Sequence, residues 1–188
     1  MYVCTANLCR SPMAAALFAR ETAGSGESVE TTSAGILPVG GAVPGEVVEV
    51  MGAYGIDLSG HRSRTIHAAV VADADLLVGM GRRHVREAVL LDPGSWPRAF
   101  TLKSLVQRGR EVGPRAPGSD LASWLDAVHD GRTRTELAHR STVDEVADPY
   151  GGPLSGYRAT ARELSELTSE LADLLWPGRA GKEDDPRG

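Results

Sequence analysis

The sequence predicts an α/β fold, a three-layer sandwich in which a central, mostly four-stranded parallel sheet has helices on both faces. Short segments rich in β-branched and apolar residues alternate with segments of helical periodicity along the first half of the chain. This alternation is typical of parallel sheets, because the crossover between two parallel strands is usually a helix. Right-handed crossovers bring the carboxyl ends of the strands to one edge, where functional groups gather.

Four segments are expected to form the strands. Residues 1–3 and 75–80 are mostly apolar, residues 28–33 contain valine and threonine, and residues 98–102 contain phenylalanine, threonine and leucine. Residues 1–3 fall short of the roughly five residues usual for a strand. Either the true start lies upstream or the sheet is weakened here, and we expect a chain extended upstream in frame to be more stable.

Helical periodicity and end signals place the helices between and after these strands. Gly24 and Gly26 end the first helix and Pro177 ends the last, because glycine and proline interrupt helical structure. In the last helix apolar side chains recur at helical spacing, which indicates core packing. The predicted helices are residues 13–23, 45–54, 65–72, 82–91, 120–130 and 154–175.

The chain is expected to form one domain over residues 1–176. Its 188 residues, with 41% hydrophobic and 24% charged side chains, are typical of a single globular domain. Residues 108–118 are rich in glycine, proline and arginine and are expected to form a surface loop. They begin an insertion over about residues 108–143, interpreted as solvated, with a substrate-contacting lid as the alternative. Residues 177–188 are expected to form a disordered tail.

The most informative motif is the run of residues 4–12, Cys-Thr-Ala-Asn-Leu-Cys-Arg-Ser-Pro. The five residues between Cys4 and Arg10 let the backbone curl until successive N–H groups face one tetrahedral anion. Arg10 offers a planar fork of donors to two phosphate oxygens. Ser11 and Pro12 are typical of a helix start, whose partial positive charge favours a bound anion and the Cys4 thiolate. The motif predicts attack on phosphate by sulfur, and a buried structural cysteine is the alternative.

A second motif lies far along the chain, where residues 148–152 read Asp-Pro-Tyr-Gly-Gly. Such a sequence is typical of a loop. Asp148 on this loop could protonate a leaving oxygen and later take a proton from water. Tyr150 would give the loop an aromatic wall. By itself the motif would be interpreted as an ordinary turn.

Together these motifs resemble those of the low-molecular-weight protein tyrosine phosphatases. Residues 3–12 match the family signature, and residues 148–150 match its late Asp-Pro-aromatic motif. Two landmarks between them also match: residues 33–35, Ser-Ala-Gly, and residues 55–62, Gly-Ile-Asp-Leu-Ser-Gly-His-Arg. Four motifs in the family's order make a chance similarity improbable.

The resemblance implies a role for each matching residue. Cys4 would be the nucleophile, Arg10 would bind phosphate and stabilise the transition state, and Asp148 would be the general acid. Tyr150 would line the substrate pocket. The phosphate-binding loop would comprise Thr5, Ala6, Asn7, Leu8, Cys9 and Ser11, and Ser33 and His61 would join Asn7 and Ser11 in a supporting hydrogen-bond network.

The sequence also departs from the family pattern. Ala6 stands where the family often has glycine, which is tolerable unless the backbone there needs a positive φ. Ile36, Leu37 and Val39 stand where tyrosine-specific members have an aromatic residue, which weakens one wall of a phosphotyrosine pocket.

The leading interpretation is a protein tyrosine phosphatase that hydrolyses phosphomonoesters through a phosphocysteine intermediate. Leu8 favours it, because tyrosine-directed members usually carry a bulky aliphatic residue there, whereas the related protein arginine phosphatases tend to carry threonine. The two glycines after Tyr150 resemble the arginine phosphatases, so protein arginine phosphatase is the alternative. Arsenate reductase on the same fold is another, although thioredoxin-linked members need further cysteines and none follows Cys9. A phosphopeptide-binding module without turnover is the non-enzyme alternative.

Charge and cysteine content constrain the partners. A net charge of −5 provides no general basic surface for nucleic acid, and no apolar run approaches the length that spans a membrane. The two cysteines suit neither a structural zinc site nor a structural disulfide. We therefore expect a cytoplasmic monomer without metal or cofactor that acts on a phosphorylated protein. Cys9 either packs in the core or protects Cys4 by forming a reversible disulfide.

Overall fold

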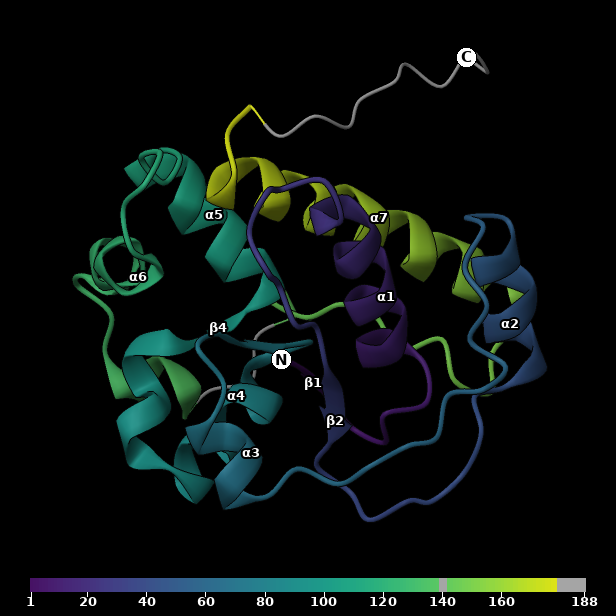
Figure 1. Cartoon of the computed structure of the whole chain (residues 1–188). Helices are drawn as coiled ribbons and strands as arrows, with labels where there is room; N and C mark the ends of the chain where they lie inside the picture. Colours follow the sequence, from purple (N-terminus) through teal and green to yellow (C-terminus); the bar gives the residue numbers. More distant parts are fainter. Residues whose placement is uncertain (139–141, 179–188) are drawn as a thin grey trace.

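The computed structural model describes residues 1–138 and 142–178 (Figure 1). Within these residues four strands form one parallel sheet in the order β2-β1-β3-β4. Tyr2 lies opposite both Ser33 and Val78, so β1 is a central strand. The predicted α/β sandwich is confirmed. The strands are β1 (Tyr2–Cys4), β2 (Ser33–Gly35), β3 (Leu77–Gly79) and β4 (Ala99–Thr101).

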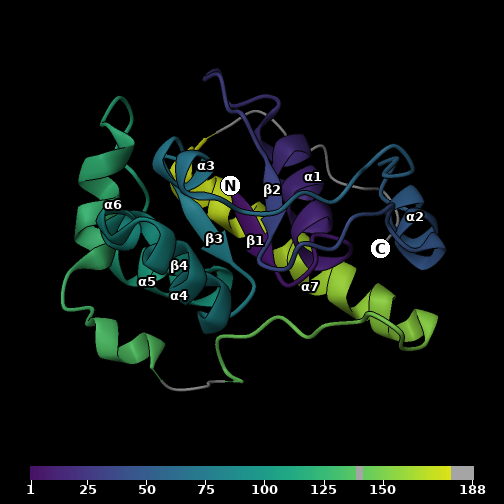
Figure 2. The ribbon, with the colours of Figure 1, turned by 90° about the horizontal axis from the view of Figure 1, so that it is seen from below.

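Helices cover both faces of this sheet (Figures 1 and 2). Side chains alternate along β1, so Tyr2 and Cys4 pack in the cluster formed with α1, α5 and α7, and Val3 packs in the cluster formed with α4. Cys4 therefore ends its strand beside α1. The helices are α1 (Arg10–Thr22), α2 (Gly45–Gly52), α3 (Ala68–Ala72), α4 (Arg82–Leu91), α5 (Leu102–Val112), α6 (Leu121–His129) and α7 (Leu154–Leu175), with 3₁₀ helices η1 (Pro93–Arg98) and η2 (Arg134–Leu137).

Helical periodicity located several helices correctly. The helices predicted over residues 82–91 and 154–175 have those boundaries as α4 and α7, and the helix predicted over residues 120–130 forms as α6. Each of these helices buries one apolar face in the core, so its apolar residues recur at helical spacing in the sequence. The tail predicted over residues 177–188 lies outside the described residues from residue 179 onward.

The strand predicted over residues 28–33 was wrong in its position. Only Ser33 of this segment belongs to β2, which continues to Gly35. Residues 28–32 are not part of a strand. One hydrogen bond ties their end to β1, from the Tyr2 N–H to the Thr32 carbonyl at 2.8 Å. Because β1 begins at Tyr2, no neighbouring strand lies beside the earlier residues, and β-branched composition by itself does not form a strand.

The helix predicted over residues 65–72 also begins later than expected. Thr65 forms an isolated parallel bridge with Gly35, and the Ile66 N–H donates to the Gly35 carbonyl at 2.8 Å. These residues extend the edge of β2, so the helix starts only at Ala68.

The surface loop predicted over residues 108–118 was wrong for residues 108–112, which complete α5. Gly109 is buried in this helix, where an added Cβ would lie 2.8 Å from Leu174 Cδ1 and 3.1 Å from Trp124 Cζ2. The glycine that suggested a loop instead permits close packing of α5 against α6 and α7. Local composition could not show this, because the reason lies in distant helices.

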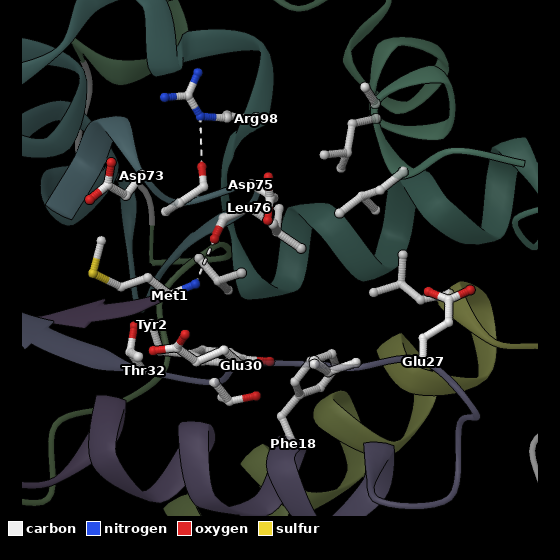
Figure 3. Close-up of a pocket in the computed structure, with 18 of the residues that line it drawn as sticks. Met1, Tyr2, Phe18, Glu27, Glu30, Thr32, Asp73, Asp75, Leu76 and Arg98 are labelled. Atoms are coloured by element: carbon white, nitrogen blue, oxygen red, sulfur yellow. Dashed lines mark hydrogen bonds between the residues drawn. The ribbon is translucent and has the colours of Figure 1, made fainter. Parts of the chain in front are cut away.

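A groove of about 1060 Å³ lies at the amino end of the strands, opposite the end that carries Cys4. Figure 3 shows Met1 between Leu76 on one side and Glu30 and Thr32 on the other. The amino group of Met1 donates to the Leu76 carbonyl at 2.6 Å. The groove is therefore bounded by the two segments that lead into β2 and β3.

Among the described residues, no helix combines the length and apolar character needed to cross a membrane.

Candidate active site

The 4–11 loop, which joins β1 to α1, changes direction at Asn7. Asn7 has a φ of 55°, the only positive φ at a non-glycine residue in the described chain. Asparagine tolerates this left-handed conformation better than most residues. Ala6 does not have a positive φ, so its Cβ introduces no backbone strain.

The loop rests directly on the end of β2. The Ile36 N–H donates to the Cys4 carbonyl at 3.0 Å, and the Leu37 N–H donates to the Thr5 carbonyl at 2.9 Å. A Cβ at Gly35 would lie 2.8 Å from the backbone carbon of Ala6. Glycine is required at this position because backbone packs against backbone.

A hydrogen-bond network centred on Asn7 holds the loop in shape. The side-chain nitrogen of Asn7, Nδ2, donates to Ser11 Oγ at 3.0 Å and to Ser33 Oγ at 2.8 Å. His61 Nε2 donates to the Asn7 carbonyl at 3.0 Å, and the Arg64 N–H donates to Asn7 Oδ1 at 3.0 Å. Each polar atom of the Asn7 side chain is therefore satisfied by another segment, and the left-handed turn is locked.

The loop presents donors that have no protein partner. The backbone N–H groups of Thr5, Ala6, Leu8 and Cys9 make no hydrogen bond to another described residue. The buried Nε of Arg10 also has no partner there. Unpaired donors concentrated at a helix start, one of them the buried Arg10 Nε, indicate a site for an anion.

Cys4 lies at the base of this loop and is 2% exposed. Its Sγ accepts hydrogen bonds from the Asn7 N–H at 3.2 Å and from Ser11 Oγ at 3.0 Å. Two donors from the loop and the start of α1 are therefore directed at the sulfur of Cys4.

Arg10 is anchored from several sides. Its Nη1 donates to the Val146 carbonyl at 3.2 Å, and its Nη2 donates to Thr5 Oγ1 at 3.1 Å. Nη2 also pairs with the Asp148 carboxylate, and the Glu145 carboxylate lies 3.8 Å from Nη1. The guanidinium side chain is only 3% exposed, so its orientation is set by these partners.

The loop over residues 147–153 brings Asp148 to Arg10. The Asp148 side chain is 44% exposed, so it has access both to the guanidinium and to solvent. The Gly152 N–H donates to the Pro149 carbonyl at 2.9 Å, and Gly151 has a φ of 74°, which closes a tight turn. Tyr150 is exposed on this turn.

Two loop residues face the protein interior. Leu8 and Cys9 both pack in the large apolar cluster. Burial raises the pKa of the Cys9 thiol to about 12, and the negative charges of Asp148 and Cys4 act in the same direction. Cys9 is therefore a neutral thiol in apolar surroundings, whereas the sulfur of Cys4 accepts two hydrogen bonds.

The matches to known proteins agree with this geometry. The model of the low molecular weight phosphotyrosine protein phosphatase family matches residues 1–113. The chain belongs to this family. A protein-arginine-phosphatase of Bacillus subtilis is 31% identical over 178 residues, 93% of this chain and 95% of that protein. A low molecular weight protein-tyrosine-phosphatase of Streptomyces coelicolor is 36% identical over 177 residues, 90% of this chain and 88% of that protein.

Solved structures of family members have the same fold. The low molecular weight protein tyrosine phosphatase of T. tengcongensis superposes with a TM-score of 0.67 at 33% identity, covering 93% of this chain and 97% of that chain. A mutant of the YwlE arginine phosphatase with a phosphorylated active site serine gives a TM-score of 0.70 at 28% identity and covers 95% of each chain.

In this member of the family, the residues predicted for the site come together. Cys4, Arg10 and Asp148 meet around one loop, and Ser33 and His61 contact Asn7 as described above. The sequence interpretation missed several residues that contact this loop. Arg64, Val146 and Glu145 contribute through backbone atoms or through distant sequence positions, for which the sequence carries no local signal. His84, which contacts Thr5, was taken only as part of a helix.

Proposed function

We propose that the chain is a cysteine-dependent phosphatase that hydrolyses phosphotyrosine in proteins through a phosphocysteine intermediate. One observation carries the proposal. A buried cysteine begins a loop in which several backbone N–H groups and Arg10 Nε have no partner among the residues that the structure describes, and the Asp148 carboxylate pairs with the same guanidinium. This arrangement supplies a nucleophile, donors for phosphate oxygens and a proton donor.

In the first proposed step, the Cys4 thiolate attacks phosphorus. The S–P bond forms as the P–O bond to the tyrosyl oxygen breaks, and the leaving oxygen takes the proton of Asp148. Donors of the 4–11 loop and Arg10 neutralise the negative charge on the nonbridging phosphate oxygens. This stabilisation is strongest in the transition state. Holding Cys4, Arg10 and Asp148 close to the bound phosphate lowers the activation barrier further.

In the second proposed step, water attacks the phosphocysteine. The Asp148 carboxylate takes a proton from that water, the P–S bond breaks, and inorganic phosphate and the Cys4 thiolate are released. The same carboxyl group thus ends the cycle protonated, as it began. Its exposure on the loop over residues 147–153 gives it access to both the leaving group and the water.

Binding of phosphate requires an exchange at Arg10. Asp148 occupies Nη2 of the guanidinium in the structure, which is one of the atoms a phosphate oxygen would use. We propose that the incoming phosphate displaces Asp148 from Arg10 and leaves its carboxyl group facing the leaving oxygen. Thr5 and Val146 keep the guanidinium in place during this exchange.

Phosphoarginine is the second candidate substrate. Arginine phosphatases of Bacillus subtilis and Geobacillus stearothermophilus each match 93% of this chain. The half-exposed carboxylate of Glu145 beside Arg10 could pair with the guanidinium of such a substrate. Leu8 stands at the loop position where the related arginine phosphatases tend to carry threonine, and this bulky aliphatic residue supports phosphotyrosine as the first choice.

The test is phosphate release from matched phosphotyrosine and phosphoarginine peptides in the presence of EDTA. Turnover of phosphotyrosine that is lost in Cys4→Ser and insensitive to EDTA is the expected result, because sulfur attacks and Arg10 neutralises charge without a metal. Faster turnover of phosphoarginine would assign the second candidate. Absence of both activities in the native chain would overturn the proposed function.

We further propose that the protein acts as a monomer in the cytoplasm on a phosphorylated protein, with no metal, cofactor, nucleic acid or membrane as partner. A nucleophilic thiol works best in a reducing compartment. The net charge of −5 is unsuited to a nucleic-acid substrate.

A further inference from the structure

His84 lies beneath the active site, in the first turn of α4, and is only 2% exposed. Its Nε2 is 3.1 Å from Thr5 Oγ1. Thr5 Oγ1 is also 3.1 Å from Nη2 of Arg10. A chain of polar contacts therefore runs from α4 on one face of the sheet, through the partly buried Thr5 hydroxyl, to the guanidinium of the active site.

The chemistry of the groups determines the direction of one of these two hydrogen bonds. A guanidinium can only donate, so Thr5 Oγ1 accepts from Arg10. The hydroxyl oxygen has a second lone pair and one hydrogen, so it pairs with His84 Nε2 in either tautomer of the imidazole, by donating to the bare nitrogen or by accepting from the N–H. In both cases the Thr5 hydroxyl links the imidazole to the guanidinium.

The surroundings keep the imidazole of His84 neutral. Burial lowers the pKa of His84 to about 3, and the positive charges of Arg10 and Arg83 act in the same direction. A protonated imidazole would place a second positive charge beside the guanidinium. Near neutral pH His84 therefore contacts Thr5 as an uncharged ring.

We propose that His84 is a positioning residue that orients the Arg10 guanidinium through the Thr5 hydroxyl. The inference rests on the proposed function, in which Arg10 stabilises the transition state. Asp148, the other side-chain group on Nη2, is half-exposed and must leave when phosphate binds. His84 is buried, and its hydrogen bond to Thr5 does not have to break when phosphate binds, so the pair holds the guanidinium plane while Asp148 moves.

Matched variants isolate the hydrogen bond between residue 84 and Thr5. His84→Leu removes it, whereas His84→Gln places an amide group, which can donate or accept, near the position of Nε2. We expect His84→Leu to lower kcat by about tenfold with little change in KM, because alignment matters most in the transition state. His84→Gln should restore most of the activity. The exposed His67 serves as the control, and His67→Leu should leave both parameters unchanged.

A double-mutant cycle tests the route through Thr5. Thr5→Val removes the hydroxyl at nearly constant volume, and its effect on kcat should equal that of His84→Leu. The double variant should be no worse than either single variant, since both remove one relay. Independent, multiplying losses would overturn the proposal. So would a failure of His84→Gln to exceed His84→Leu at equal melting temperatures.

A second readout does not depend on turnover. Arg10 should direct anionic iodoacetate to Cys4 in preference to neutral iodoacetamide, and inorganic phosphate should protect Cys4 from both. The iodoacetate preference should fall several-fold in His84→Leu and Thr5→Val. An unchanged preference would overturn the proposal, even if the native chain proved to act on neither phosphotyrosine nor phosphoarginine. If His84→Leu fails to fold, the iodoacetate preference of Thr5→Val alone tests the proposal.

Discussion

At the scale of single residues, the site depends on side chains that do two tasks at once. Asn7 both adopts a left-handed backbone and ties three segments together, and Ser11 contacts both Asn7 and the Cys4 sulfur. The sequence alone could predict these participants from motif spacing and from the tolerance of asparagine for positive φ. It could not predict Arg64, which contributes a backbone N–H that any residue possesses.

Replacing Asn7 separates backbone strain from lost hydrogen bonds. Asn7→Gly keeps the conformational freedom but removes the network, and should cost about 2 kcal/mol of unfolding free energy. Asn7→Ala should cost about 1 kcal/mol more, because a Cβ without a polar partner is strained at this φ. Urea denaturation of the two variants measures the difference. Equal stabilities would show that the positive φ carries no strain here.

Asp148 should matter most where the leaving group is poor. Asp148→Asn is expected to slow hydrolysis of phenyl phosphate by about 10²- to 10³-fold, because a poor leaving oxygen needs the proton. Hydrolysis of p-nitrophenyl phosphate, with a good leaving group, should fall far less. Steady-state kinetics on both esters, with the exposed Asp130→Asn as control, tests the role. A uniform loss on both esters would remove Asp148 from it.

At the scale of elements, short strands and close backbone packing position the chemistry. The sequence interpretation found β3 and β4 because buried apolar runs are local signals, and it misplaced β2 because pairing depends on where β1 begins. It also took the end of α5 for a loop, since the need for Gly109 arises from Trp124 and Leu174. Elements defined by their own side chains were predictable, and elements defined by neighbours were not.

Gly35 connects β2 to the 4–11 loop. In Gly35→Ala the new Cβ would meet backbone atoms of Ala6 and Asn7 at 2.8 Å, and backbone cannot rotate away as a side chain can. We expect a loss of about 2 kcal/mol in stability and a larger fractional loss of kcat, because the loop itself must shift. Gly45, which has open space around it, provides the control Gly45→Ala. Similar behaviour of both variants would contradict the role of Gly35.

Lengthening β1 should stabilise the sheet. An Ile-Val-Ile segment fused ahead of Met1 would enter the groove of Figure 3 between residues 29–32 and 74–76. Continuing the register of Tyr2 with Ser33 and Val78, its last residue would bond to the Thr32 N–H and the Glu30 carbonyl. We expect Tm to rise by about 5 °C.

A Gly-Ser-Gly extension of equal length is the matched control, because it supplies the backbone without the apolar side chains. It should give a smaller rise. If both extended chains melted at the same temperature as the unextended chain, the groove would not accept a strand. Calorimetry at one protein concentration is sufficient.

At the scale of the whole molecule, the sheet transmits support from one helical layer to the other. Cys4 and Arg10 belong to the α1 and α7 side, whereas His84 comes from α4 on the opposite face and reaches Thr5 where the loop leaves the sheet. The sequence predicted the layers from the alternation of elements. It could not pair Thr5 with His84, because their proximity exists only once β1 and β3 lie side by side.

Global stability should rise with pH near neutrality because of the buried amino group of Met1. Its pKa is lowered from 8.0 to about 6, chiefly by burial, with the Arg64 charge acting in the same direction and Asp75 opposing it. Between these two values the unfolded chain binds more protons than the folded chain, so the free energy of unfolding increases with pH. The expected gain between pH 6 and pH 8 is about 2 kcal/mol. Urea denaturation across this range measures it, and the same chain acetylated at its amino terminus should keep only a smaller rise, the part that the lowered pKa of His84 contributes. If the native and the acetylated chains showed the same dependence from pH 6 to pH 8, the amino group would be solvated in the folded chain, contrary to this prediction.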